Sequence, residues 1–117
     1  MTMRLPFAAL LLSLSLATHA ETSAMNTPLL DAARHGDAPV VRQLLDRGAL
    51  PDTRNDQGQT ALLVAEILGD GGPRYVEIVR RLLAAGADPR ITDKEGVTAL
   101  EHARQRGYRE VVTLLEQ

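Results

Sequence analysis

Apolar residues recur along this chain in a block that is present three times. Each block starts with a threonine, continues through small and apolar residues to a glycine, and then presents branched residues followed by a leucine pair. The blocks begin at Thr27, Thr60 and Thr98, so the first spacing is 33 residues and the second is 38. A period of this length indicates a repeat architecture, with five extra residues in the second unit.

Each block predicts two short helices. The leading threonines are expected N-caps, because a Thr hydroxyl can accept from the free N–H groups of a first helical turn. Pro28 suits the first helical position, where its missing N–H costs nothing. The second helix has apolar residues at i, i+1, i+4 and i+5, which form one face. In the first block these residues are Val40, Val41, Leu44 and Leu45.

Glycines and turn sequences separate the predicted helices. A first set of glycines is expected to end the first helix of each block: Gly36, Gly69 and Gly107. Gly48 and Gly86 fit the left-handed position just after the second helix. The segments 55–58 and 93–96 have the composition of tight turns.

This pattern resembles the ankyrin repeat, whose motif is Gly-x-Thr-Pro-Leu, small residues, Gly, Val-Val-x-x-Leu-Leu and Gly-Ala-Asp. The resemblance covers Thr27 to Gln117 in three copies, 27–59, 60–97 and 98–117. It implies an all-α solenoid of three helix-turn-helix repeats with short β-hairpin connections. The family's histidine after Thr-Pro-Leu is replaced here by Leu30, Leu63 and Glu101, so the hydrogen bonds of that histidine are in doubt.

The third copy is more polar than the others, at Glu101, Arg104 and Glu116. A terminal repeat has a face without a neighbour, and a polar face keeps it soluble. Thr98 and Glu101 also have the spacing of a capping box. We therefore expect residues 98–117 to be a C-terminal cap and the array to be complete.

The first 20 residues are typical of an export signal. Arg4 precedes a 13-residue apolar run, Leu5 to Ala17, and Thr18-His19-Ala20 has the small residues of a cleavage site. The run is shorter than the roughly 20 residues that a membrane-spanning helix needs. We expect cleavage after residue 20, or alternatively after residue 24, with residues 21–26 as a lead-in. The expected location is the periplasm of a Gram-negative bacterium, with secretion as the alternative.

The composition of the chain argues against several classes of function. The formal net charge of −2 offers no basic excess for phosphate neutralisation, so nucleic-acid binding is not expected. With no cysteine, the chain cannot use disulfides, thiolate metal sites or a cysteine nucleophile. Membrane insertion after signal cleavage is not expected either. Aromatic residues are scarce, and they are Phe7, Tyr75 and Tyr108.

The usual catalytic and metal-binding motifs are also missing. Ser23 is the only serine after the leader, and His35 and His102 lack metal-ligand spacing. The glycine-rich segment 69–72 lacks the Lys-Ser/Thr of a phosphate loop, and residues 52–58 lack the ligand spacing of a calcium loop. We therefore expect no enzyme activity, no cofactor and no metal.

The resemblance implies that a protein partner binds the hairpin tips and the exposed side of each first helix. The corresponding tip residues are Arg54, Asp56, Gln57, Gln59, Thr92, Lys94, Glu95 and Val97. The corresponding helix residues are Arg34, His35, Ile67, Leu68, Gln105 and Arg106.

Ile67 and Leu68 are apolar at positions that are usually polar, in the same repeat as the five-residue insertion within 70–75. In one interpretation the insertion covers this pair, with Tyr75 as the lid. In the other, the pair forms an apolar anchor for the partner, with Arg74 and Tyr75 as contact residues of the types enriched in hot spots. We favour the anchor.

The functional hypothesis is a monomeric, exported interaction module that binds another protein of the cell envelope. The resemblance extends to periplasmic accessory proteins that support a resident enzyme, for example an oxidative-stress enzyme such as catalase. It also extends to immunity or inhibitor proteins that neutralise a toxin and to secreted effectors that bind a host protein. A self-associating structural array is a further alternative. The residues do not choose among them.

Overall fold

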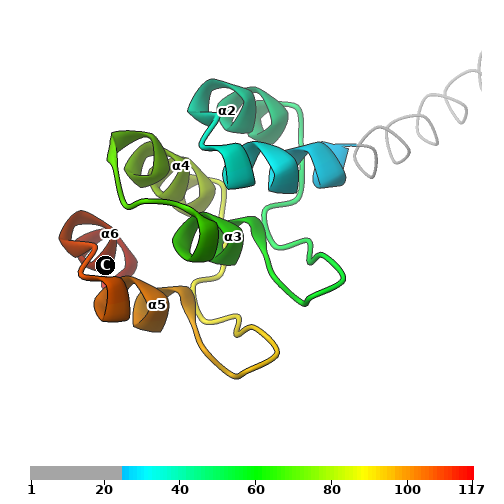
Figure 1. Cartoon of the computed structure of the whole chain (residues 1–117). Helices are drawn as coiled ribbons and strands as arrows, with labels where there is room; N and C mark the ends of the chain where they lie inside the picture. Colours follow the sequence, from blue (N-terminus) through cyan, green and yellow to red (C-terminus); the bar gives the residue numbers. More distant parts are fainter. Residues whose placement is uncertain (1–24) are drawn as a thin grey trace, which may run out of the picture.

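The computed structural model describes residues 25–117, and the predicted signal peptide and its two cleavage sites lie outside them. Residues 25–35 are helical and are followed by α2 (Ala38–Asp46), α3 (Ala61–Leu68), α4 (Pro73–Ala84), α5 (Ala99–Arg106) and α6 (Arg109–Leu115). These helices form three stacked antiparallel pairs (Figure 1). We call helix 25–35, α3 and α5 the inner helices, and α2, α4 and α6 the outer helices. The predicted all-α repeat solenoid is confirmed.

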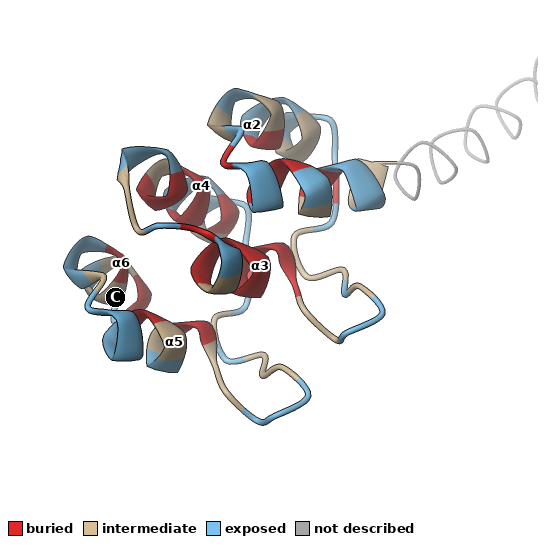
Figure 2. Ribbon diagram, in the orientation of Figure 1, coloured by how far each residue is buried: buried red, intermediate tan, exposed pale blue. Residues whose placement is uncertain are grey.

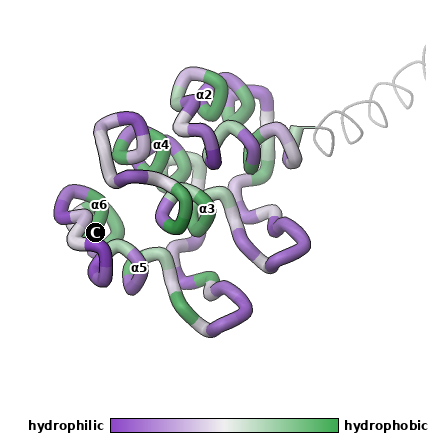
Figure 3. The backbone as a smooth tube through the Cα atoms, viewed as in Figure 1, coloured by the Kyte–Doolittle hydropathy of each residue, from purple (hydrophilic) through white to green (hydrophobic). Residues whose placement is uncertain are grey.

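Two long loops connect successive helix pairs and project to the same side of the stack (Figure 1). Their tips are tight turns as predicted: Gly58 N–H donates to the Asn55 carbonyl at 3.0 Å, and Gly96 N–H donates to the Asp93 carbonyl at 3.0 Å. Between α2 and the end of the chain, pairing is limited to one isolated antiparallel bridge, Thr92 with Thr98. The sheet content is therefore as slight as expected, and the tips are hydrophilic (Figure 3).

Two of the three predicted threonine caps are present. The Thr60 hydroxyl accepts from Leu63 N–H at 3.3 Å, and the Thr98 hydroxyl accepts from Glu101 N–H at 3.2 Å. The capping box differs in one detail, because the Glu101 carboxylate accepts from the Thr98 hydroxyl rather than from its backbone N–H. Each hydroxyl satisfies a donor that the helix itself leaves free.

The prediction for Thr27 is wrong, since residues 25 and 26 are already helical. Met25 packs against the core, and the Asn26 side chain accepts from Leu50 N–H at 3.1 Å. These contacts to distant residues hold an earlier turn of the helix, so the repeat domain starts at or before residue 25. The predicted lead-in, 21–26, thus overlaps the repeat domain by at least two residues.

Two of the outer helices, α2 and α4, end as the glycines predict. Gly48 has φ +99° and Gly86 has φ +93°, and each follows a Schellman pattern. Ala49 N–H donates to the Leu44 carbonyl at 3.0 Å, and Ala87 N–H donates to the Leu82 carbonyl at 2.9 Å. The two alanines, 5% and 6% exposed, thereby enter the core. Between the repeats, Asp88 N–H donates to the Asp52 carboxylate at 2.9 Å.

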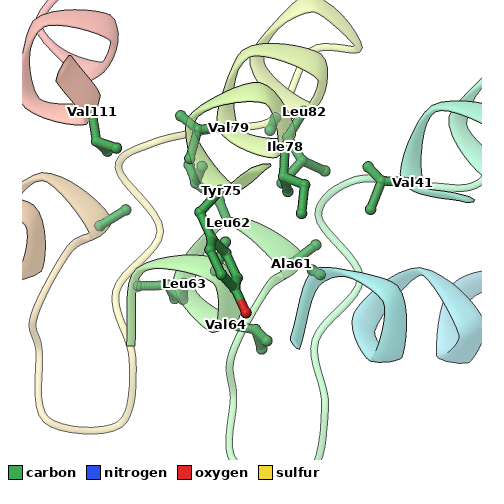
Figure 4. Packing of buried hydrophobic residues seen from close by; sticks show 14 of the residues in the cluster. Val41, Ala61, Leu62, Leu63, Val64, Tyr75, Ile78, Val79, Leu82 and Val111 are labelled. Carbon is green, nitrogen blue, oxygen red and sulfur yellow. The ribbon is translucent and has the colours of Figure 1, made fainter. Parts of the chain in front are cut away.

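The core runs through the centre of the stack, between inner and outer helices (Figures 2 and 4). Residues 61–66 of α3 are all buried, because the middle repeat has a neighbour on each side. In the third repeat the polar residues Glu101, Arg104 and Glu116 are exposed, and Arg104 pairs with Glu116 at 3.4 Å. Among the helices of residues 25–117, none has both the length and the apolar character required to cross a bilayer.

Candidate partner-binding groove

A groove of about 450 Å³ lies between the ends of the inner helices and the projecting loops. It is called the groove below. Its lining comes from the first helix, both loops and α3: Arg34, Gln57, Gln59, Leu68, Asp93, Lys94 and Glu95. Six of these seven residues belong to the predicted partner-binding set, and they come from parts of the chain about 60 residues apart. The repeat fold thus brings together residues that the sequence keeps distant.

The inner helices contribute one wall of the groove region. The predicted helix residues are the last two of each inner helix: Arg34 and His35, Ile67 and Leu68, Gln105 and Arg106. Five of these six residues are exposed, and Ile67 is half-buried against the core. Leu68 is 50% exposed, which makes it one of two large exposed apolar residues among residues 25–117. This helix-end row therefore places one apolar side chain at its centre.

The loops contribute the opposite wall, and each loop is held by one side chain. Asn55 Oδ1 accepts from the N–H groups of Gln57 and Gln59, both at 2.9 Å. Asp93 Oδ1 accepts from Glu95 N–H at 2.9 Å and from Val97 N–H at 3.0 Å. Because residues 93 and 55 occupy equivalent places, the same local device fixes both loop tips.

Asp93 also ties its loop to α5. His102 Nε2 lies 2.8 Å from Asp93 Oδ2, and both side chains are largely buried. The backbone hydrogen bond from Val97 and then the bond from His102 lower the pKa of the Asp93 carboxyl below its usual value of 3.8. The sequence indicated Asp93 only as a turn residue, whereas the structure places it in the groove wall with its carboxylate already bonded.

Tyr75 is buried within the repeat domain, which disagrees with the prediction of an exposed contact residue. It is only 7% exposed, and its hydroxyl donates to the Arg34 carbonyl at 2.9 Å. Its ring points from α4 into the core (Figure 4). The segment 70–75 is not all loop, since α4 begins at Pro73 and so carries Tyr75 inward. The structure therefore favours a covering role for Tyr75, although Leu68 itself stays half exposed.

Tyr108 repeats the arrangement of Tyr75 one repeat later. Its hydroxyl donates to the Gly69 carbonyl at 3.0 Å, so each tyrosine at the start of an outer helix bonds a carbonyl at the end of the inner helix of the preceding repeat. These carbonyls lack partners within their own helix. The sequence offered one signal for this pair: Tyr75 and Tyr108 are the only aromatic residues after Phe7.

Glycines in and just before the insertion make room for the tyrosine rings. A β-carbon at Gly69 would overlap the Tyr75 ring, and one at Gly71 would overlap the Tyr108 ring. Gly71 also has φ +71°, a conformation that other residues rarely adopt. Asp70 closes the turn by accepting from Gly72 N–H at 2.8 Å. The insertion is therefore a packed connection that lets α4 and α6 place their tyrosines.

The other predicted residues lie outside the groove lining. Arg54 and Asp56 are exposed on the first loop, Thr92 and Val97 are half-buried on the second, and Arg74 is exposed with its guanidinium 6.0 Å from the centre of the Tyr75 ring. His35, Gln105 and Arg106 are exposed at helix ends. Among the described residues, no group of three or more His, Asp or Glu side chains could hold a metal ion.

Glu66 is a buried carboxyl that sequence reasoning missed. It is 1% exposed on α3, and no described residue forms a hydrogen bond to its Oε2 atom. Burial raises its pKa from 4.5 to about 7, and the positive charge of Arg106 opposes that rise. A signal was present, because Glu66 is the one charged residue in the run Ala61–Leu68.

Comparison with known proteins identifies the family. A family model described as ankyrin repeats (3 copies) matches residues 6–93 and 29–117. The chain belongs to the ankyrin-repeat family. The first match extends into residues 6–20, where the sequence predicts an export signal. Ankyrin repeats are protein–protein interaction modules, so membership of this family implies a protein partner.

Several ankyrin-repeat relatives are similar to this chain. An ankyrin repeat protein of Escherichia coli (strain K12), YahD, is 42% identical over 88 residues, which are 74% of this chain and 44% of YahD. A homolog of the transient receptor potential cation channel subfamily A member 1 from Caenorhabditis elegans is 44% identical over 55 residues, 47% of this chain and 4% of the channel.

Two solved ankyrin-repeat structures have the same fold. One, an ankyrin repeat domain from Acinetobacter baumannii AYE, has a TM-score of 0.74 at 49% identity and covers 75% of this chain. The other, the ankyrin repeat protein EF0377, has a TM-score of 0.73 at 41% identity and covers 76%. This chain spans less than half the length of both structures and of both relatives.

In this ankyrin-repeat protein the usual histidine positions are used for packing or caps. Leu63 is buried in the core, and Leu30 packs against that core. Glu101 belongs to the Thr98 cap. His102 is one place later and bonds Asp93, in the loop that leads to its own helix. The repeats are instead joined by the tyrosine bonds and by Asp52.

Proposed function

We propose that this ankyrin-repeat protein binds an extended segment of another protein in the groove, and that it does so without catalysing a reaction. The observation that carries the proposal is the groove itself, where Leu68 is half exposed between polar side chains of the helix ends and loops. An exposed apolar group in a concave, mostly polar lining is a typical anchor point for a partner.

The groove dimensions and polarity fit an extended segment. Its volume of about 450 Å³ is sufficient for a few side chains but too small for a folded domain to enter. Gln59 Oε1 already accepts from the Asn55 side chain at 3.0 Å, which leaves the Gln59 amide N–H groups and the Gln57 amide to bond a partner backbone. Leu68 can take an apolar side chain from the partner. The partner would thus lie across the repeats, with its side chains alternating between the two walls.

The proposed site of action is the periplasm, with an envelope protein as partner and the ankyrin-repeat protein as a monomer that supports it. The support for export is the pattern of residues 1–20, with its basic start, short apolar run and small residues before the cleavage site. Mass spectrometry of the purified protein tests this point. A chain that starts at Glu21, or at Met25 after the alternative cleavage, agrees with export, whereas a chain that retains residues 1–20 contradicts it.

A photo-crosslinking experiment tests the groove. A photoreactive residue replaces Gln57 in the full chain, and the tagged protein is irradiated in an envelope extract. Leu68→Asp should remove the specific crosslinked band, because a carboxylate would replace the apolar anchor. Leu50→Asp is the matched control, since Leu50 is 54% exposed and lies outside the groove. If Leu68→Asp and Leu50→Asp give crosslinked bands of equal intensity, and both keep the wild-type melting temperature, the groove is not the binding site.

The crosslinked partner also separates the functional alternatives. A supported enzyme, such as a catalase, should co-purify with the ankyrin-repeat protein and retain its activity. An inhibited toxin should lose activity on binding, and its association should depend strongly on salt, as for electrostatically optimised inhibitors. Recovery of a host protein from a cell lysate, with none from the envelope, would favour a secreted effector.

A further inference from the structure

The side-chain amide of Gln59 has a fixed orientation in the groove. Asn55 Oδ1 accepts two backbone N–H groups, from Gln57 and Gln59, so the Nδ2 atom of Asn55 is the donor that faces the Gln59 side chain. Nδ2 lies 3.0 Å from Gln59 Oε1, and this contact is a hydrogen bond only if the Gln59 oxygen accepts. The Gln59 amide is therefore held with its oxygen towards Asn55, which leaves the Nε2 group, a donor only, for a partner.

The second loop shows which part of this arrangement the turn itself requires. Asp93 occupies the place of Asn55, and its Oδ1 atom accepts from the N–H groups of Glu95 and Val97 in the same way. Val97 stands where the first loop has Gln59, so the second loop has no amide at that position. The turn thus forms with either Asn or Asp at its start, and the bond to the Gln59 amide is an addition to it.

Hydrogen-bond donors outnumber acceptors in the groove. Four lining residues carry side-chain N–H groups that bond no other residue within 25–117: Arg34, Gln57, Gln59 and Lys94. The lining acceptors are mostly in use, since Gln59 Oε1 accepts from Asn55 and both oxygens of Asp93 are bonded. Glu95 and the side-chain oxygen of Gln57 are the acceptors that remain. A partner must therefore supply mainly acceptors.

Proline meets this requirement better than other residues. Every residue of a partner offers a carbonyl oxygen, but every residue except proline also carries a backbone N–H group. An N–H group placed against the donors of the groove would lose water without gaining an acceptor, which weakens binding. Proline has no N–H group and an extended backbone, so it presents a carbonyl oxygen without this cost. Its fixed φ also reduces the conformational entropy that the segment loses on binding.

We propose that Gln59, positioned by Asn55, is a specificity-determining donor of the groove, and that the groove selects extended segments with proline beside the apolar residue on Leu68. This inference rests on the proposed function, because it specifies the segment that the same groove holds. Gln59 selects for a carbonyl oxygen, and the donors around it select against the N–H group that proline lacks. The lining carries two basic and two acidic side chains, so the selection rests on hydrogen bonds and not on net charge.

Two neutral peptides test the inference by NMR titration of the isotope-labelled full chain. The first is acetyl-Ser-Gly-Leu-Pro-Gly-Ser-amide, and the second has alanine in place of proline. The proline peptide should shift the backbone amide signal of Leu68 and the side-chain NH2 signals of Gln59 saturably at millimolar concentration. It should bind about tenfold more tightly than the alanine peptide, about fivefold from the N–H group without an acceptor and about twofold from the stiffer free peptide.

Two variants invert the donor without changing Leu68. Gln59→Glu replaces the Nε2 group by an oxygen, while the other oxygen can still accept from Asn55. Asn55→Asp keeps the turn, as Asp93 does, but offers Gln59 an acceptor, so the Gln59 amide rotates and directs its oxygen to the groove. Each variant should lower the preference for the proline peptide from about tenfold to about twofold. Gln43→Glu, exposed on α2, adds the same charge and should leave the preference unchanged.

Several results would overturn the inference. They are equal binding of the two peptides, tighter binding of the alanine peptide, no saturable shift, or a tenfold preference that persists in either variant. An equal loss of preference in Gln43→Glu would reveal a general charge effect and also contradict it. A merely structural role of Asn55 and Gln59 predicts lower melting temperatures with an unchanged preference for proline, which is again contrary to the inference. A partner that crosslinks through Gln57 despite such a result would leave the proposed function standing.

Discussion

Glu66→Gln should make the protein more stable at neutral pH and remove part of its pH dependence. Glu66 is 1% exposed, its Oε2 atom has no hydrogen-bond partner among the described residues, and its pKa is raised to about 7. Glutamine keeps the shape and the polarity of the protonated side chain but cannot ionise. The substitution therefore removes only the cost of burying a negative charge.

The size and pH range of the effect follow from linkage. The pKa of Glu66 is near 4.5 in the unfolded chain and about 7 in the folded chain. Between these pH values the folded state therefore binds a proton that the unfolded state has lost. The contribution of Glu66 to stability is thus highest below about pH 4.5, declines as the pH rises towards 7, and remains at the lower level above it. One pKa unit corresponds to about 1.4 kcal/mol, so the full difference is about 3 kcal/mol.

Urea denaturation of both proteins from pH 4.5 to pH 8 measures this effect. The difference in the free energy of unfolding, Glu66→Gln minus wild type, should rise from near zero to about 3 kcal/mol across that range. Taking the difference cancels the titration of the other groups. A difference that stays constant with pH, or that declines, would show that Glu66 is ionised at no special cost and that the reasoning is wrong.

Three further predictions concern the ties within and between repeats. Tyr75→Ala should cost about 3–5 kcal/mol because its ring is buried, whereas Tyr75→Phe and Tyr108→Phe should each cost about 1 kcal/mol for one hydrogen bond; thermal unfolding measures all three. Leu82→Ala, at 0% exposure in the middle repeat, should cost about 2–5 kcal/mol in urea denaturation, and an unchanged midpoint would contradict the packing. Asp93→Asn should lower stability near neutral pH, and the deficit should vanish as the pH falls through the lowered pKa of Asp93, as measured by acid unfolding.

Local chemistry made much of the fold predictable. Thr60, Thr98, Gly48 and Gly86 act through atoms within a few residues of themselves, so their caps and closures follow from the sequence alone. Thr27 failed for the opposite reason. The start of its helix is decided partly by a bond from Leu50, 24 residues away from Asn26, and such a distant contact leaves no local pattern.

The sequence predicted which residues lie at the groove, but not how each of them is packed and bonded. The repeat alignment placed Arg34, Leu68 and Lys94 correctly on the exposed side of the array. It assigned Tyr75 to the same surface, because an insertion hides whether a residue belongs to a loop or to the next helix. The chain resolves this by starting α4 at Pro73, two residues before Tyr75. For Glu66 the only sequence signal was its place as the one charged residue in an apolar helix, and the repeat alignment did not reinforce it, since the equivalent position in the first repeat is the small residue Ala33.

The same ties that escaped prediction make the groove suitable for binding. Asn55 and Asp93 fix the two loop tips, and the stem of Lys94 lies against Gly58 of the neighbouring loop. On the other wall, the tyrosine hydroxyls hold the carbonyls of Arg34 and Gly69 at the helix ends. Both walls are therefore set before a partner arrives. Ordering them on binding would cost conformational entropy, so a groove with fixed walls can hold an extended segment with few contacts.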